Sequence, residues 1–315
     1  MPRILLVKTS SLGDLVHNLP VASDIASVVP GAQIDWVAEE SMAAIPALHY
    51  AVKSVMPVAI RRWRKAAWAP GTWREVRAFL RRLRSARYDA IVDTQGLLKS
   101  ALIARAARGT RYGFDWTTSR EPLAVFYDRT FHVPRQIHAV ERNRILAAAA
   151  LRYEKPAAVD YGIRADVVVR PIVDGDYVVL LHGTSARAKL WPGERWIELG
   201  RALSGKATRC VLPWGTREEH ARSRSLAESI PGALVPPRLP LGELASLLSG
   251  ARYAIGVDTG LTHLAGALGV ATVGIYVTTD PSRTGLRCAR GVNLGGPASL
   301  PTVREVLQTL RSLEE

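Results

Sequence analysis

The sequence predicts an α/β protein built from two Rossmann-like, doubly wound domains that face a central cleft. Short apolar runs alternate with helical patterns in both halves of the chain, and a less regular stretch with Pro and Gly separates the halves. The length of 315 residues also exceeds that of a usual single domain. Short buried strands between helices form parallel sheets, whose ligands bind beyond the carboxyl ends of the strands.

The first half, residues 1–160, repeats strand and helix. We expect strands over 4–7, 34–38, 55–59 and 90–92, and helices over 15–28 and 73–83. In the second helix Trp73, Val76, Leu80 and Leu83 recur at helical spacing. We therefore expect these four side chains to be buried and the surrounding arginines to form a solvated face.

The second half, residues 161–300, restarts the pattern after a linker expected between 153 and 175. We expect strands over 177–181, 209–212, 253–257 and 272–276, and helices over 194–203, 217–229, 241–248 and 261–268. The loops after these strands are the places where a ligand is expected.

The composition indicates which partners the protein binds and which kinds of protein it is unlike. The formal net charge of +14 predicts anionic partners, which include phosphorylated substrates, nucleic acid and an anionic membrane face. For the basic run RRWRK at 61–65, an anion site and a solvated helix face both remain open. The two cysteines, without metal-ligand spacing, argue against a disulfide framework and structural zinc. The N-terminus lacks a signal-peptide pattern and no window has the apolar length of a membrane span, so we expect a cytoplasmic protein.

The stretch KTSSLGDLVHNLP, residues 8–20, follows the first apolar strand. It has neither the P-loop nor the dinucleotide-binding glycine pattern. Gly13 is expected to allow a sharp turn and to place Asp14 at the start of a helix, where backbone N–H groups stabilise a carboxylate. From these residues alone, simple helix capping by Asp14 is the stronger interpretation.

Three loops of the second half carry candidate ligand-binding residues. Thr184, Ser185 and Lys189 offer hydroxyls and a charge suited to phosphate. The stretch at 256–269 offers N–H groups of Thr259 and Gly260 as an anion site, whereas Asp258 suits sugar hydroxyls because a carboxylate repels a diphosphate. His263 is expected to pack or cap. In the loop 212–220, either Glu218 or Glu219 suits a ribose diol, although a glutamate-rich helix start explains both equally well.

Seven motifs in order resemble the bacterial lipopolysaccharide heptosyltransferases, type I in particular. They are TSSLGD, IRRWRK, DTQGLLKS, REPL, HAVER, LPWG and VDTGLTHLAGAL. The resemblance covers nearly the whole chain. It implies the glycosyltransferase-B fold, with a C-terminal helix over 301–315 crossing back toward the first domain. It also implies metal-independent transfer of L-glycero-D-manno-heptose from ADP-heptose to the inner Kdo of Kdo2-lipid A, with inversion and without a cofactor.

The resemblance also implies roles for residues. Asp14 is the expected general base, a role consistent with an ionised carboxylate beside the acceptor. The expected donor site comprises Thr184, Ser185, Lys189, Glu219, Leu239, Asp258, Thr259, Gly260 and His263. The expected acceptor site comprises Ser10, Ser11, Gly13, Arg61, Arg62, Lys65 and Arg120, with Thr9 beside it. The chain departs from the family at Val277-Thr278, where relatives usually have Gly-Pro.

Other functions compete with this interpretation. A sister heptosyltransferase would use another acceptor, such as an already heptosylated core. A basic nucleic-acid-binding protein fits the charge, but no nucleic-acid-binding module is evident. An NAD-dependent epimerase is disfavoured by the missing glycine pattern. We expect a monomer that contacts the anionic inner membrane leaflet and does not bind nucleic acid.

Overall fold

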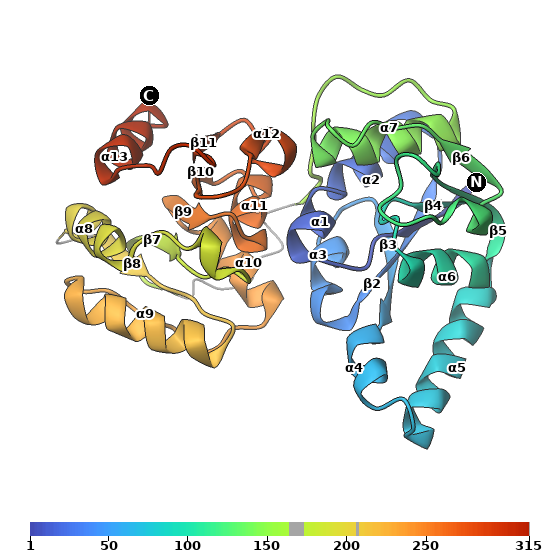
Figure 1. Cartoon of the computed structure of the whole chain (residues 1–315), viewed down its shortest axis with the longest axis horizontal. Helices are drawn as coiled ribbons and strands as arrows, with labels where there is room; N and C mark the ends of the chain where they lie inside the picture. The colour runs from blue at the N-terminus through green and yellow to red at the C-terminus, as the bar shows by residue number, and fades with distance from the viewer. Residues whose placement is uncertain (164–172, 206–207, 315) are drawn as a thin grey trace. The chain divides into compact units, whose positions relative to one another are not determined.

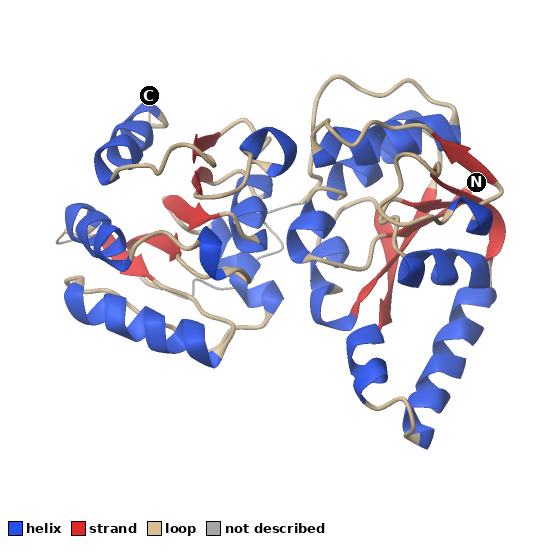
Figure 2. Ribbon diagram, in the orientation of Figure 1, coloured by secondary structure: helices blue, strands red, loops and turns tan. Residues whose placement is uncertain are grey.

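The computed structural model describes residues 1–163, 173–205 and 208–314. The chain forms two compact units, Met1–Ile163 and Arg164–Glu315, each with its own parallel sheet between helices (Figures 1 and 2). The predicted α/β class is therefore confirmed. The linker expected over 153–175 spans the division between the units, and its residues 164–172, with Pro171, lie outside the described residues.

The first unit contains a sheet with strand order β3-β2-β1-β4-β5-β6, in which neighbouring strands are parallel. Its strands are β1 (Arg3–Val7), β2 (Gln33–Glu39), β3 (Val52–Val58), β4 (Arg87–Asp93), β5 (Arg108–Phe114) and β6 (Arg129–Phe131). Its helices are α1 (Leu12–Val16), α2 (Leu19–Val28), α3 (Ala44–Ala47), α4 (Ile60–Lys65), α5 (Pro70–Arg84), α6 (Leu98–Ala106) and α7 (Ala139–Leu151), with short 3-10 turns η1 (Glu40–Met42) and η2 (Ala124–Phe126).

Helices cover both faces of this sheet. The pair α2 and α7 packs on one face, joined by the buried ion pair between Arg144 and Asp24, whose closest N–O distance is 2.7 Å. The pair α5 and α6 packs on the other face (Figure 1). The central strand β1 is buried from Ile4 to Val7, because both of its faces are covered.

Two expectations for this unit are wrong. The helix expected over 15–28 is two helices, because Pro20 offers no N–H for a continuous helical ladder, and α2 begins with this proline in its first turn. Trp73 is not part of the core, because it is 55% exposed. Leu83 is buried as expected, Val76 and Leu80 are half-buried, and Thr72 and Phe79 are also buried. The sequence analysis assigned no element to α6, α7, β5 or β6.

The second unit contains a parallel sheet with strand order β11-β10-β9-β7-β8. Its strands are β7 (Asp176–Leu181), β8 (Thr208–Val211), β9 (Tyr253–Val257), β10 (Ala271–Tyr276) and β11 (Gly291–Gly295). Its helices are α8 (Gly193–Leu203), α9 (Arg217–Ser229), α10 (Leu241–Ser249), α11 (Gly260–Ala267), α12 (Pro281–Thr284) and α13 (Val303–Ser312), and η4 (Arg187–Lys189) is a 3-10 turn. The bounds of β7 to β10 and of α8 to α11 agree closely with the expected elements, whereas β11 and α12 were not expected.

The last helix, α13, belongs to the second unit. It buries Val303, Val306 and Leu310 in the core that α8 and α9 form on one face of the sheet. The helices α10 and α11 pack against each other, and α11 also contacts β9 and β10. Its return toward the first domain stays a prediction. Among the described residues, no helix has the length and apolar character that a membrane span requires.

In both units the strand order reverses beside the first strand of the unit. The chain leaves β1 toward α1 and α2 but leaves β4, its neighbour, toward α6 on the opposite face. In the second unit it leaves β7 toward α8 and leaves β9 toward α11. The loops diverge at such switch points, where open α/β sheets bind ligands.

Candidate active site

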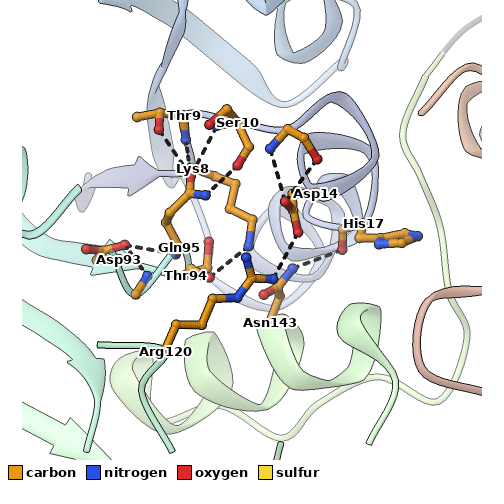
Figure 3. A network of polar contacts seen from close by, with 12 residues as sticks. Lys8, Thr9, Ser10, Asp14, His17, Asp93, Thr94, Gln95, Arg120 and Asn143 are labelled. Atoms are coloured by element: carbon orange, nitrogen blue, oxygen red, sulfur yellow. Dashed lines mark hydrogen bonds and ion pairs between the residues drawn. The ribbon is translucent and has the colours of Figure 1, made fainter. Parts of the chain in front are cut away.

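The switch point of the first unit is held together by Gln95. Its side-chain oxygen accepts hydrogen bonds from the backbone N–H groups of Thr9 (2.7 Å) and Ser10 (3.1 Å), and its amide donates back to the carbonyl of Ser10 (Figure 3). Gln95 is itself positioned by Asp93, which accepts the N–H of Gln95 at 2.8 Å. The loop after β4 therefore fixes the shape of the loop after β1.

Asp14 lies on α1 just beyond this loop. Its Oδ2 accepts hydrogen bonds from the backbone N–H of Ser11 (3.0 Å) and from the Ser11 hydroxyl (3.1 Å), so the predicted capping role is present. Its Oδ1 lies 3.3 Å from Nη2 of Arg120 (Figure 3). The two oxygens of Asp14 thus have different partners. Oδ2 caps the start of α1, and Oδ1 faces the side chain of Arg120.

The charge of Asp14 is stabilised by cations. Burial by itself raises the pKa of Asp14, but the charges of Lys8 and Arg120 and the N–H of Ser11 outweigh it and lower the pKa to about 2. Lys8 is buried below the carboxylate, where its ammonium donates to the carbonyl of Thr94 at 2.8 Å. Burial lowers the pKa of Lys8 to about 8, with Asp14 opposing the shift. Asp14 is therefore ionised at neutral pH.

Gly13 is placed differently from the expectation. It lies inside α1, and the non-helical stretch that leads from the strand to this helix is Lys8–Ser11. The sharp turn expected at Gly13 is wrong, because the turn is made before the helix and held from outside by Gln95.

The basic residues expected to bind the acceptor differ in their contacts. Arg62 forms ion pairs with Glu40 (3.0 Å) and Glu75 (2.8 Å), so its charge is already compensated. Arg61 and Lys65 are exposed and form no ion pair within the part of the chain that the structure describes. Within the described residues, α4 therefore carries three exposed charges without an ion pair, those of Arg61, Arg64 and Lys65.

Lys99 contacts the loop that leads to Asp14. Its ammonium donates to the Ser10 hydroxyl at 2.5 Å. Burial lowers the pKa of Lys99, and the charges of Glu39, Arg61 and Asp14 also act on this pKa. None of Lys8, Gln95 and Lys99 was expected from the sequence to belong to the site, although Gln95 and Lys99 belong to the motif DTQGLLKS at 93–100.

The switch point of the second unit is centred on Asp258. Its Oδ2 accepts hydrogen bonds from Lys189 (2.7 Å) and from the Thr279 hydroxyl (2.8 Å), and its Oδ1 lies 3.4 Å from Nε2 of His263. Burial alone raises the pKa of Asp258, but the hydrogen bonds from His263, Lys189 and Thr279 outweigh it and hold the pKa well below its usual range. The loops that follow β7, β9 and β10 therefore meet at this carboxylate.

The other expected donor residues surround Asp258 or lie nearby. Thr184 donates its hydroxyl to the carbonyl of Asp258 at 3.2 Å, and Ser185 next to it is exposed. Thr259 is the N-cap residue of α11 and Gly260 its first residue, so the helix begins one residue before the expected start. Leu239 is half-buried in the loop before α10.

Two capping expectations have clear outcomes. Asp258 suits the cap of α11 by its position before Thr259, but it does not cap this helix, because its side chain is occupied by Lys189 and Thr279. Glu219 does cap α9: its Oε2 accepts the N–H groups of Gly215 (2.8 Å) and Thr216 (2.9 Å). The side chain of Glu219 lies close to Gly183, and a Cβ at that position would be only 2.7 Å from the other carboxylate oxygen, Oε1. The glycine therefore leaves room for Glu219. Helix capping therefore accounts for one oxygen of Glu219 only.

No group of three or more His, Cys, Asp or Glu side chains at metal-binding distance is found among the residues that the structure describes. The first half-site contains instead an ionised carboxylate, Asp14, whose Oδ1 lies against Arg120. The second contains an ammonium group with hydroxyls around a fixed carboxylate. The first arrangement suits proton acceptance and the second suits the binding of an oxygen-rich anion.

Comparison with known proteins decides the family. The chain matches Glycosyltransferase family 9 (heptosyltransferase) over residues 76–308. It is 45% identical to lipopolysaccharide heptosyltransferase 1 of Escherichia coli (strain K12) over 287 residues, which cover 90% of each chain. The chain belongs to glycosyltransferase family 9. It is thus a glycosyltransferase of the heptosyltransferase family, as the motifs predicted.

Solved structures agree with this family assignment. E. coli heptosyltransferase WaaC with ADP is 42% identical and superposes with a TM-score of 0.92 over 99% of both chains. The same protein with ADP-2-deoxy-2-fluoro heptose is similar with a TM-score of 0.87 over 98% of this chain and 99% of that one. The predicted glycosyltransferase-B fold of the family 9 enzyme is confirmed.

Proposed function

We propose that the chain transfers L-glycero-D-manno-heptose from ADP-heptose to the inner Kdo of Kdo2-lipid A, with inversion at the anomeric carbon. The single observation that carries the mechanism is Asp14, an ionised carboxylate at a switch point with Oδ1 directed away from its own helix. The relatives at 45–46% identity that are named lipopolysaccharide heptosyltransferase 1 support the choice of donor and acceptor.

In the proposed reaction the acceptor hydroxyl oxygen attacks the anomeric carbon of heptose. Its proton passes to Oδ1 of Asp14, and the bond between the anomeric carbon and the ADP oxygen breaks, with the electron pair leaving on ADP. An inverting displacement needs one such base on the side opposite the leaving group. Ser10, Ser11 and Gly13 line the approach of the acceptor hydroxyl.

The donor residues act on the leaving group. Lys189, with Thr184 and Ser185, neutralises the charge that develops on the diphosphate, which is where electrostatic stabilisation has its largest effect. The N–H groups of Thr259 and Gly260 bind the same phosphates.

The remaining donor residues bind the sugars and the base. Asp258, oriented by His263 and Thr279, accepts hydrogen bonds from heptose hydroxyls. The free oxygen of Glu219 binds ribose, and Leu239 packs on adenine. Because Lys189 supplies positive charge at the diphosphate, we propose that the reaction requires no metal and no cofactor.

The acceptor is acidic, and the basic residues of the first unit match it. Arg61, Arg62, Lys65 and Arg120 are proposed to bind its carboxylates and phosphates, together with Lys99, which contacts Ser10 beside Asp14. We further propose that the enzyme acts as a monomer at the cytoplasmic face of the inner membrane, where a lipid acceptor is presented, and that it does not bind nucleic acid.

A coupled assay of ADP release tests this function. Wild-type enzyme with ADP-heptose is expected to release ADP only when Kdo2-lipid A is added. A heptosylated core acceptor in a parallel reaction is the control for a sister enzyme. Release with the heptosylated acceptor alone would replace the proposed acceptor, and release with neither would overturn the proposed reaction.

A further inference from the structure

The hairpin of α4 and α5 carries aromatic side chains that the fold does not bury. Trp68, in the turn between the helices, is 97% exposed, and Trp73 in the first part of α5 is 55% exposed. The other residues of this turn, Ala66, Ala67, Ala69 and Pro70, are exposed as well. An apolar tip with a fully exposed tryptophan has no stabilising role within the first unit.

Next to this tip, one face of α5 is a stripe of arginines. Arg74, Arg77, Arg81 and Arg84, together with Leu80 and Arg108 of β5, line an open depression of about 830 Å³. Residues three, four and seven apart share a helix face, so Trp73 lies on the same face as Arg77, Leu80 and Arg84. We refer to the tip 66–70, Trp73 and these depression-lining residues as the basic stripe.

The charges of the basic stripe are not compensated by the protein. Arg74, Arg77 and Arg81 form no ion pair in the ranges that the structure describes. The one acidic residue of α5, Glu75, pairs instead with Arg62 and accepts a hydrogen bond from Trp63 of α4 at 2.8 Å. Like charges at this spacing destabilise a helix, and a partner with negative charge relieves that repulsion.

We propose that the basic stripe is the surface by which the enzyme docks on an anionic lipid bilayer. The depression is too open to enclose one soluble ligand, whereas α5, at 15 residues, is about 22 Å long and suits a plane of phosphate headgroups. Tryptophan prefers the boundary between headgroups and acyl chains, and clustered basic residues bind anionic lipids.

The location of the hairpin fits this role. The helix α4 follows β3 at the carboxyl edge of the sheet, the same edge that carries Asp14, and it also carries the proposed acceptor residues Arg61 and Lys65. A docked stripe therefore brings the acceptor residues to the surface in which a lipid acceptor lies. The inference rests on the proposed function for this link to the acceptor, but bilayer docking itself is tested without any acceptor.

The test is flotation of the full-length protein with phosphatidylcholine vesicles that contain about one-third phosphatidylglycerol, compared with pure phosphatidylcholine vesicles. The variant Arg74→Gln/Arg77→Gln/Arg81→Gln is expected to bind the anionic vesicles about 100-fold more weakly, since each charge contributes about fivefold. Trp68→Ala is expected to weaken binding about fivefold while leaving the net charge unchanged.

The matched control is Arg209→Gln/Arg224→Gln/Arg304→Gln, which removes three exposed charges from the second unit. It is expected to change binding by less than about twofold. An equal loss in both triple variants would show that net charge alone drives binding and would overturn the proposal. The absence of wild-type binding to anionic vesicles would overturn it as well, as would tighter binding to a single-stranded RNA that displaces the vesicles.

An activity assay with two forms of the acceptor distinguishes a role of the basic stripe in membrane docking from a role in the reaction itself. With ADP-heptose and acceptor embedded in anionic vesicles, the α5 triple variant is expected to lose activity, and with detergent-dispersed acceptor it is expected to equal wild type. Loss with both acceptor forms would assign the stripe to catalysis or folding and contradict the docking role. If no acceptor supports turnover, the proposed function fails, whereas the flotation result still decides the docking surface.

Discussion

The two half-sites each contain an ionised carboxylate beside a lysine, but the two carboxylates are held differently. Both oxygens of Asp258 are engaged, by Lys189 and Thr279 on one side and by His263 on the other, and its side chain is 9% exposed. Asp14 uses only Oδ2 for its helix, and Oδ1 meets Arg120, whose side chain is 46% exposed. Asp258 is therefore held in one orientation by contacts to both of its oxygens, whereas the only ion-pair partner of Oδ1 of Asp14 in the described residues is a half-exposed arginine.

The largest expected effect comes from Asp14→Asn, which keeps the size of the side chain but removes the base. We expect kcat to fall about 10²- to 10⁴-fold, the usual contribution of a general base. ADP affinity, measured by calorimetry, is expected to stay within a few-fold, since the proposed nucleotide site is in the other unit. Asp258→Asn is the matched comparison and is expected to weaken donor binding instead. Full activity of Asp14→Asn would remove Asp14 from the mechanism.

The next effect is expected for Lys189→Ala. Loss of a charge-assisted contact to phosphate typically costs about 1.5–3 kcal/mol, so the Kd for ADP-heptose should rise about 10- to 150-fold. Lys189→Arg should restore part of this. The control is Arg187→Ala, two residues earlier, which removes an exposed ion pair with Glu218 and is expected to change little. Unchanged donor affinity in Lys189→Ala would place Lys189 outside the site.

A smaller effect is expected for Arg120→Gln, read from the pH profile of kcat/KM. The charge of Arg120 favours the ionised form of Asp14, so its removal raises the pKa of Asp14 from about 2. Because the base acts only when ionised, activity is then lost at higher pH than in wild type, with the acidic limb shifted by about one unit. Arg120→Lys should restore the wild-type profile. A raised acceptor KM with an unchanged profile would limit Arg120 to acceptor binding.

The smallest effect is expected for Thr279→Val, which removes one of the hydrogen bonds that fix Asp258. One neutral hydrogen bond contributes about 1 kcal/mol, so the KM for the donor is expected to rise about fivefold. Thr279→Ser should behave like wild type because it keeps the hydroxyl. Equal behaviour of the valine and serine variants would show that Lys189 and His263 fix Asp258 without this contact.

Sequence patterns predicted the second unit well and the first unit less well. In the second unit apolar strands alternate with clearly bounded helices, such as α9, whose ends agree with the prediction. In the first unit β5, RGTRYGF, has little apolar periodicity, and it forms because a neighbouring strand supplies its hydrogen bonds. Trp73 was expected inside because its spacing matches the helix, but spacing does not reveal where the sheet beneath α5 ends.

The sequence by itself determined the fold class, the family motifs and most residues proposed to bind the donor, because strand-end loops and apolar periodicity are local properties. Only the tertiary structure decided which loops meet. The pairing of β1 with β4 brings Gln95 to the loop Lys8–Ser11 before Asp14, and the pairing of β7 with β9 brings Lys189 to Asp258. Strand order depends on contacts between residues far apart in the chain, so no local pattern specifies it.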